Sequence, residues 1–68
     1  MEYKNITHEE FINLKYGDIV YIRVANIFIK RIVYKTPFTN EKNEFILKTF
    51  KPRTFYKEYE IFVKKENN

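Results

Sequence analysis

The sequence predicts a small, mostly β domain, built as an antiparallel barrel or a strongly bent sheet with one short N-terminal helix. Three observations lead to this prediction. The chain has 68 residues, which is enough for a single domain over residues 1–68. Hydrophobic residues make up 44% of it and aromatic residues 19%, which is too apolar for a disordered chain. Several short runs alternate apolar and polar residues with the period of a β-strand.

The predicted helix covers residues 7–14. A capping box opens it, with Thr7 as the N-cap and Glu10 three residues later. Gly17 follows and is suited to the positive φ at which helices commonly end.

The first predicted strand covers residues 18–24. Val20, Ile22 and Val24 recur at every second position, so they share one face of the strand. A tight turn follows, in which Asn26 tolerates left-handed backbone geometry.

The second predicted strand covers residues 27–35, but its alternation is imperfect. A β-bulge near Lys30 and Arg31 restores it, because the extra residue moves the later apolar side chains to the face of the earlier ones. With this bulge, one side of the strand carries Ile27, Ile29, Ile32 and Tyr34. Pro37 then ends the strand, since proline has no N–H group to donate to a sheet.

The C-terminal half of the chain contains a polar loop over residues 38–43 and a third strand over residues 44–50. Residues 53–64 fit either an amphipathic helix or a tight turn followed by a strand over residues 59–64. The strand is favoured because Ile61 would lie on the wrong side of the helix. Residues 65–68 are expected to fray. The predicted core draws on all these elements and consists of Phe11, Leu14, Val20, Ile22, Val24, Ile29, Ile32, Phe45, Leu47, Ile61 and Val63.

One short segment adds a family resemblance. Leu14, Gly17, Asp18 and Val20 match the Leu-x-x-Gly-Asp-x-Val opening of many SH3-like barrels, so the chain resembles the SH3-like small β-barrel superfamily over residues 14–20. Members of that superfamily bind peptides, RNA, DNA or modified histone tails. The resemblance therefore implies an SH3-like barrel and a binding module, without naming its ligand. Peptide-binding SH3 domains carry a Trp in their groove, and this chain has no Trp.

The side chains available for catalysis are few. The chain has one His, one Asp, no Ser and no Cys. His8 is expected to be solvated at the start of the helix, because no second His lies at the spacing of a zinc-protease motif. Glu58 and Glu60 are expected to be solvated partners of Lys57 and Lys64. We therefore expect no enzyme, no cofactor and no metal site.

The distribution of charge is the strongest functional signal. The formal net charge is +4, and two blocks without acidic residues, 19–40 and 45–57, carry four basic residues each. Pairing of neighbouring strands is expected to merge these blocks into one face. Basic side chains interleaved with aromatic ones suit nucleic acid, because charge attracts phosphates and rings stack on bases. The predicted contact residues are Arg23, Lys30, Arg31, Lys48, Lys51, Arg53, Phe55, Tyr56 and Lys57.

Within that set, the segment 48–57 is the predicted contact site. It contains four basic residues and no acidic one, and Pro52 makes its middle irregular. We expect Lys51 and Arg53 to contact phosphates, and Phe55 or Tyr56 to stack on a base.

Two interpretations of the partner stay open. Nucleic acid is favoured; the alternative is a host protein, bound by a phage- or mobile-element-encoded inhibitor or adaptor through exposed aromatic anchors. The abundance of Ile, Lys, Asn, Tyr and Phe, whose codons are AT-rich, indicates a gene of a low-GC bacterium or its phage. A homodimer through a strand edge is compatible with either interpretation. No apolar run reaches the length of a membrane span, so we expect a cytoplasmic protein without a membrane partner.

Overall fold

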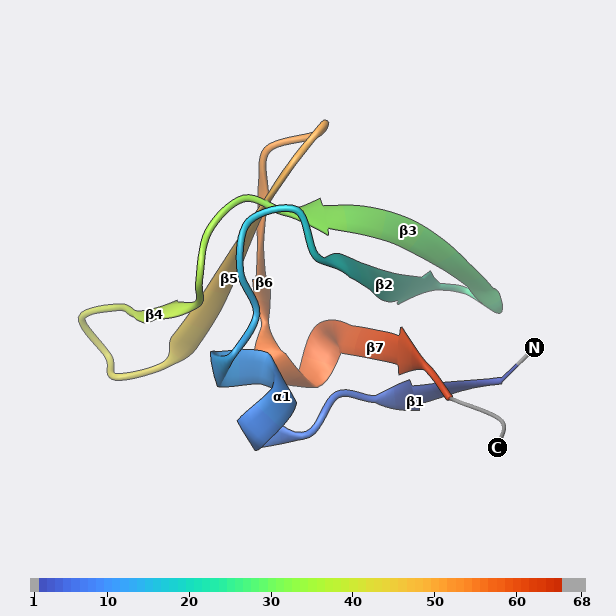
Figure 1. Cartoon of the computed structure of the whole chain (residues 1–68), viewed down its shortest axis with the longest axis horizontal. Helices are drawn as coiled ribbons and strands as arrows, with labels where there is room; N and C mark the ends of the chain where they lie inside the picture. Colours follow the sequence, from blue (N-terminus) through green and yellow to red (C-terminus); the bar gives the residue numbers. More distant parts are fainter. Residues whose placement is uncertain (1, 66–68) are drawn as a thin grey trace.

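Seven strands form one bent antiparallel sheet, with a short helix packed beside it (Figure 1). The structure is a computed structural model and describes residues 2–65. In chain order the elements are β1 (Tyr3–Asn5), α1 (His8–Ile12), β2 (Ile19–Val24), β3 (Ile27–Val33), β4 (Phe38–Thr39), β5 (Phe45–Phe50), β6 (Thr54–Lys57), the 3-10 helix η1 (Glu58–Glu60) and β7 (Ile61–Lys64). The prediction of a mostly β fold with one short helix is confirmed.

The sheet has the strand order β1-β7-β2-β3-β5-β4, and β6 pairs with the other edge of β5. Only two residue pairs join β3 to β5, Ile32 with Phe50 and Val33 with Thr49. The sheet therefore bends sharply there, and β5 and β6 run across the direction of β2 and β3 (Figure 1). The hydrogen-bonded sheet stays open rather than closing into a complete ring.

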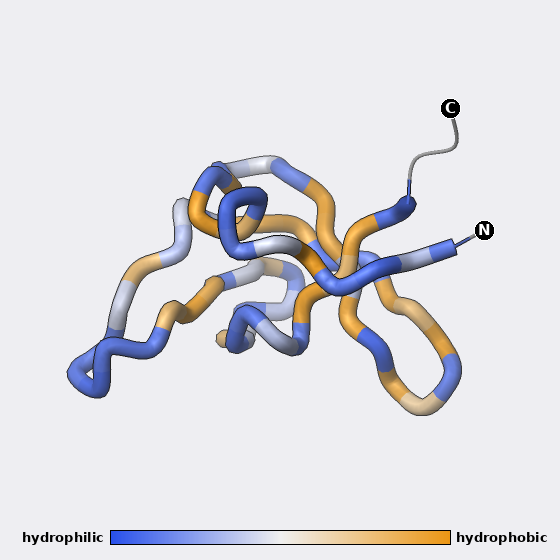
Figure 2. The backbone as a smooth tube through the Cα atoms, turned by 90° about the horizontal axis from the view of Figure 1, so that it is seen from below, coloured by the Kyte–Doolittle hydropathy of each residue, from blue (hydrophilic) through white to orange (hydrophobic). Residues whose placement is uncertain are grey.

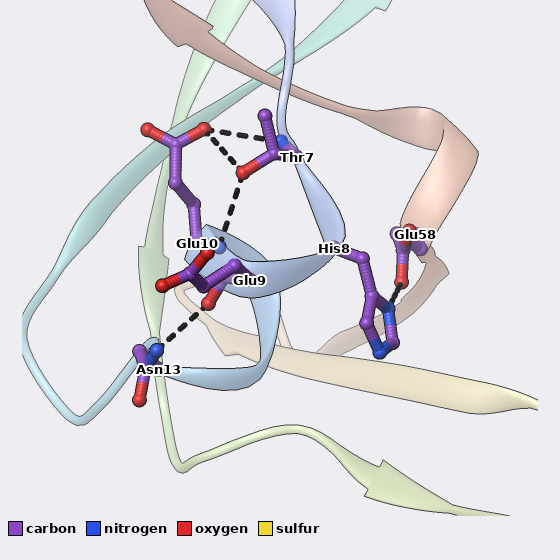
Figure 3. Close-up of polar contacts among 6 residues, drawn as sticks. All are labelled: Thr7, His8, Glu9, Glu10, Asn13 and Glu58. Carbon is purple, nitrogen blue, oxygen red and sulfur yellow. Dashed lines mark hydrogen bonds and ion pairs between the residues drawn. The ribbon is translucent and has the colours of Figure 1, made fainter.

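The capping box at the start of α1 is confirmed (Figure 3). The backbone N–H of Glu10 donates to the Thr7 hydroxyl at 3.2 Å, and the backbone N–H of Thr7 donates to the Glu10 carboxylate at 3.1 Å. The helix is shorter than predicted, since its last residue is Ile12 and Asn13 is its C-cap. Gly17 has a φ of +90° but serves the turn into β2, where its N–H donates to the carbonyl of Val33 at 2.9 Å.

The prediction of a bulge in β3 is wrong. The register between β2 and β3 is continuous from the pair Ile19–Ile32 to the pair Val24–Ile27. Arg31 therefore lies opposite the buried Val20, on the core side of the strand. No bulge is needed, because the long Arg side chain packs its stem at the core and carries its charged end to polar partners. The strand ends at Val33, two residues earlier than predicted.

The C-terminal half contains two strands that the sequence did not predict. Residues 38 and 39 form β4 inside the predicted polar loop, and β6 occupies the predicted tight turn over residues 53–57. The 3-10 helix η1 follows, so the last strand begins at Ile61 rather than at residue 59. The helical alternative for residues 53–64 is wrong. The N–H of Lys65 donates to the carbonyl of Glu2 at 2.9 Å, whereas the rest of the predicted frayed tail, residues 66–68, lies outside the described residues.

The core lies between α1 and the inner face of the bent sheet. Its buried apolar residues are Ile6, Phe11, Leu14, Val20, Ile22, Val33, Leu47 and Ile61, with Ile29, Phe45, Tyr56 and Val63 packed against them. Sequence reasoning missed Ile6, Val33, Tyr56 and the fully buried Thr49, whose hydroxyl is satisfied by the carbonyls of Pro52 and Thr54.

Two predicted core residues lie outside the core. Ile32 is only half-buried, because without the bulge it points to the outer face of β3. Val24 is 51% exposed. Strand β7 pairs only with Tyr21 and Ile22 of β2, so the tip of the β2–β3 hairpin extends beyond the rest of the sheet. Figure 2 shows this hairpin at one end of the molecule and the hydrophilic β4–β5 turn at the other.

No helix in residues 2–65 is both long enough and apolar enough to span a membrane.

Truncation of Ile22 and Val24 tests this placement of the core. Both residues lie on the same face of β2, but Ile22 is 8% exposed and Val24 is 51% exposed. We expect Ile22→Ala to lower the free energy of unfolding by about 2–5 kcal/mol, and Val24→Ala to lower it by less than about 1 kcal/mol. Denaturant melts of the two variants give both values. Equal losses of unfolding free energy in the two variants would contradict the finding that Val24, near the hairpin tip, is exposed to solvent.

The capping box predicts a pH dependence of stability. The pKa of Glu10 is held below its ordinary value of 4.5, first by the hydrogen bond from the Thr7 backbone N–H, then by the Thr7 hydroxyl and by Lys4. Because the folded-state pKa is lowered, the stabilisation is fully present above pH 4.5 and is lost as the pH falls through the folded-state pKa.

We expect Thr7→Ala to lower the free energy of unfolding by about 1 kcal/mol at neutral pH. Glu10→Gln is expected to be destabilising at neutral pH and to match the unsubstituted protein progressively as the pH falls below 4.5. Glu9→Gln is the control, because Glu9 lies in the same turn but its carboxylate does not bond Thr7 (Figure 3). Thermal melts across the acid range measure the effect. A stability difference between Glu10→Gln and the unsubstituted protein that does not change with pH would refute the capping role of the Glu10 charge.

Candidate partner-binding face

The register of β5 and β6 divides the predicted contact segment between two faces. Lys48 pairs with Phe55, and Ile46 with Lys57, on the outer face of the sheet. The alternate positions of both strands point to the core, so Tyr56 lies beside Leu47 on the inner side. The structure therefore brings Lys48, Phe55 and Lys57 together and separates them from Tyr56.

Lys48 is the centre of a continuous row of rings and basic side chains on this outer face. In order of contact, the aromatic row consists of Lys35, Phe38, Phe55, Lys48, Tyr34, Phe50 and Tyr16. Its members come from the segment before β2, the segment after β3, and strands β4, β5 and β6. The fold thus joins residues that are far apart in the sequence.

The middle of the row places one cation between two exposed rings. The ammonium nitrogen of Lys48 lies 4.8 Å from the ring centroid of Tyr34 and 5.6 Å from that of Phe55. Tyr34 is 41% exposed and Phe55 is 57% exposed. The backbone N–H of Tyr34 donates to the carbonyl of Lys48 at 2.9 Å, which holds that ring position against β5.

Half-buried rings support the exposed ones from either side. Phe38 meets Phe55 edge to face with centroids 6.4 Å apart, and Phe50 meets Tyr34 edge to face at 6.0 Å. Beyond Phe50, the ring of Tyr16 lies parallel at 5.6 Å and is 69% exposed. Such edge-to-face and offset contacts are the favourable geometries for aromatic pairs, so the exposed rings are held in defined positions.

Two further cations lie at the end of the β5–β6 hairpin. Lys51 and Arg53 flank Pro52 in the turn, and both are exposed. Lys57 differs from them, because its ammonium forms a 2.9 Å ion pair with Glu44. This hydrogen bond lowers the pKa of Glu44, to which Asn40 also contributes, and it raises the pKa of Lys57. The charge of Lys57 is thus already paired with a carboxylate of the protein.

The remaining predicted contact residues do not join the aromatic row. Arg31 points to the core side, where its Nε donates to the Tyr56 hydroxyl at 3.3 Å and its Nη1 donates to the carbonyl of Lys30 at 2.9 Å. Lys30 lies on the outer face of β3 opposite Tyr21. Arg23 lies near the hairpin tip and donates to its own turn, at the carbonyl of Ala25 and the side chain of Asn26. The expected merging of the two basic blocks is therefore only partial: Lys35 of the first block joins the aromatic row, whereas Arg23, Lys30 and Arg31 lie elsewhere on the sheet.

A second aromatic cluster covers the outer face at the other end of the sheet. It consists of Tyr3, Tyr21, Phe28 and Phe62, all half-buried. The rings of Tyr3 and Phe28 stack with centroids 4.1 Å apart, which ties β1 to β3 across two intervening strands. These rings pack mainly on one another, so the cluster stabilises the sheet.

The single His also has a partner in the fold. His8 Nδ1 lies 2.7 Å from a carboxylate oxygen of Glu58, which ties the start of α1 to η1 (Figure 3). Glu60 accepts a hydrogen bond from the backbone N–H of Lys57 rather than contacting its ammonium. The prediction of Glu58 and Glu60 as partners of Lys57 and Lys64 is therefore wrong in its pairings. Across residues 2–65, no group of three His, Asp or Glu side chains could hold a metal ion.

Five members of the aromatic row were not among the predicted contact residues: Tyr16, Tyr34, Lys35, Phe38 and Phe50. The expected bulge turned Tyr34 inward, whereas the continuous register leaves it outside. The pairing of Ile32 with Phe50 brings the ends of β3 and β5 together, and no local sequence pattern predicts this pairing.

Comparisons of the chain with protein-family models, curated proteins and solved structures found no match. The resemblance to SH3-like barrels stays a prediction, and the proposals below rest on the geometry of the aromatic row.

The inward position of Tyr56 predicts that its hydroxyl contributes to the stability of the fold. We expect Tyr56→Phe to lower the free energy of unfolding by about 0.5–1.5 kcal/mol, because Arg31 Nε loses its hydrogen-bond acceptor. Tyr59→Phe is the matched control, since Tyr59 is 72% exposed, and it should leave stability unchanged. Denaturant melts measure both variants. A Tyr56→Phe protein as stable as the control would show that the Arg31 contact contributes nothing.

Proposed function

We propose that the protein is a non-enzymatic binding module that contacts nucleic acid through the aromatic row and the β5–β6 turn. The observation that carries this proposal is the position of Lys48 between two exposed rings, with Lys51 and Arg53 in the adjoining turn. Phosphates contribute affinity through basic side chains, and bases contribute through ring faces. Both kinds of group are available on this one surface.

The charge of the surface favours nucleic acid over a protein partner. Exposed aromatic rings also serve as anchors in protein interfaces, so the rings alone fit either partner. A protein that covered the row would remove Lys48 from water, which is costly unless the partner supplies an acidic group at that point. A phosphate backbone supplies negative charge along its whole length. The protein-partner alternative is therefore an outcome of the test below.

The proposal predicts a steep dependence of affinity on salt. With Lys35, Lys48, Lys51 and Arg53 on phosphates, the plot of log affinity against log salt should have a slope of about −3 to −4. We expect Lys51→Ala combined with Arg53→Ala to flatten the slope by about one to two units. Fluorescence anisotropy with labelled random-sequence oligonucleotides at several salt concentrations measures it.

A charge-matched control distinguishes a local contact from overall charge. Lys4→Gln combined with Lys65→Gln removes the same charge near β1 and β7, where both lysines form ion pairs. This variant should keep the original slope. Absence of binding at about 50 mM salt with micromolar protein would refute the proposal. Capture of one stoichiometric host protein in a nuclease-treated extract would then support the protein-partner alternative.

A further inference from the structure

We infer that the ligand of the aromatic row is a single-stranded nucleic acid, with bases stacked on Tyr34 and Phe55 and the intervening phosphate on Lys48. This inference rests on the proposed function and specifies its ligand. Its two central rings come from different parts of the fold, since Tyr34 follows β3 and Phe55 lies in β6.

The spacing of the row fits a short length of one strand. The Lys48 ammonium lies 4.8 Å from one ring centroid and 5.6 Å from the other, so the two centroids are at most about 10 Å apart. That upper limit is about three times the 3.4 Å rise per nucleotide of a duplex strand, so a few nucleotides of one chain are enough to span it. Bases of the same short segment can therefore reach both rings, while the phosphates between them pass the ammonium.

Exposure of the rings favours a single strand over a duplex. Bases in a duplex are stacked on one another, so their faces are not free to cover Tyr34 or Phe55, whereas every unpaired base offers a face. Lys48 is half-buried between these rings. A rigid duplex resting on the two exposed rings would stay away from the ammonium, but a single strand can bend down to it.

The supporting rings reduce the cost of ordering the site. Phe38 lies against Phe55 with an interplanar angle of 83°, and Phe50 lies against Tyr34 at 71°. Side chains that are already held in place lose less conformational freedom on binding. Tyr16 continues the row beyond Phe50 and offers a third exposed ring. The row is thus long enough to contact further nucleotides beyond the two whose bases stack on Tyr34 and Phe55.

The test compares a labelled single-stranded oligonucleotide of about 10 nucleotides with its own duplex. We expect the single strand to bind at least about ten times more tightly. Tyr34→Ala and Phe55→Ala should each weaken single-strand binding by about 5- to 150-fold, the cost of one lost base stack. Tyr34→Phe and Phe55→Tyr keep a ring and should stay within a few-fold of the unsubstituted protein.

Two further variants separate stacking from charge and from general surface change. Tyr59→Ala removes an exposed ring on η1, outside the row, and should leave affinity unchanged. Lys48→Met should reduce the magnitude of the salt slope by about 0.7, whereas the ring variants should leave the slope as it is. Phe55→Leu keeps apolar bulk without a ring. It should bind as weakly as Phe55→Ala, while its circular dichroism confirms that the fold is retained.

The outcomes distinguish this inference from the proposed function. If duplex binds as tightly as single strand, and Tyr34→Ala and Phe55→Ala behave like Tyr59→Ala, the single-strand inference is overturned while nucleic-acid binding stands. If neither oligonucleotide binds at about 50 mM salt, the proposed function itself is refuted, and the inference with it.

Discussion

The position of β5 is the constraint on which the rest of the structure depends. This strand pairs with β3 and β4 along one edge and with β6 along the other, so it connects both halves of the bent sheet. Its inner residues Leu47 and Thr49 have no exposed surface. Because side chains alternate along a strand, burial of these two forces Lys48 and Phe50 outward. The core and the aromatic row are therefore two consequences of one strand placement.

A domain of this size cannot bury all its aromatic side chains. The chain has six Tyr and seven Phe, and within residues 2–65 Phe11 is the only one of these rings that is completely buried. The others gather mainly on the outer face of the sheet. The rings of Tyr3, Tyr21, Phe28 and Phe62 are all half-buried and pack on one another, with the Lys64 ammonium 5.5 Å from the Tyr21 centroid. The aromatic row instead includes three exposed rings, Tyr16, Tyr34 and Phe55. This difference in exposure is why the proposal places the partner on the row rather than on the cluster.

The basic residues follow the same division. Three of the cations already have partners within the protein: Arg23, though exposed, bonds its own hairpin turn, Arg31 bonds the Tyr56 hydroxyl, and Lys57 is paired with Glu44. The predicted contact set therefore mixed structural cations with cations that face solvent. The solvent-facing ones at the β5–β6 hairpin are Lys51 and Arg53 in its turn, with Lys48 beside them on the outer face. Counting charge in the sequence cannot separate these roles, because each depends on what lies opposite the side chain.

Local patterns in the sequence determined the mostly β class, the Thr7–Glu10 capping box, the alternation of β2 and the inward position of Leu47. Each of these depends on residues a few positions apart, whose spacing the backbone geometry dictates. Only the tertiary structure decided that Arg31 points inward, that Tyr34 points outward and that Val24 lies beyond the core. These outcomes depend on the register between β2 and β3 and on the pairing of β3 with β5. Such pairings join residues that are far apart in the chain. They are selected by which apolar side chains become buried on the assembled sheet, and local periodicity does not determine them.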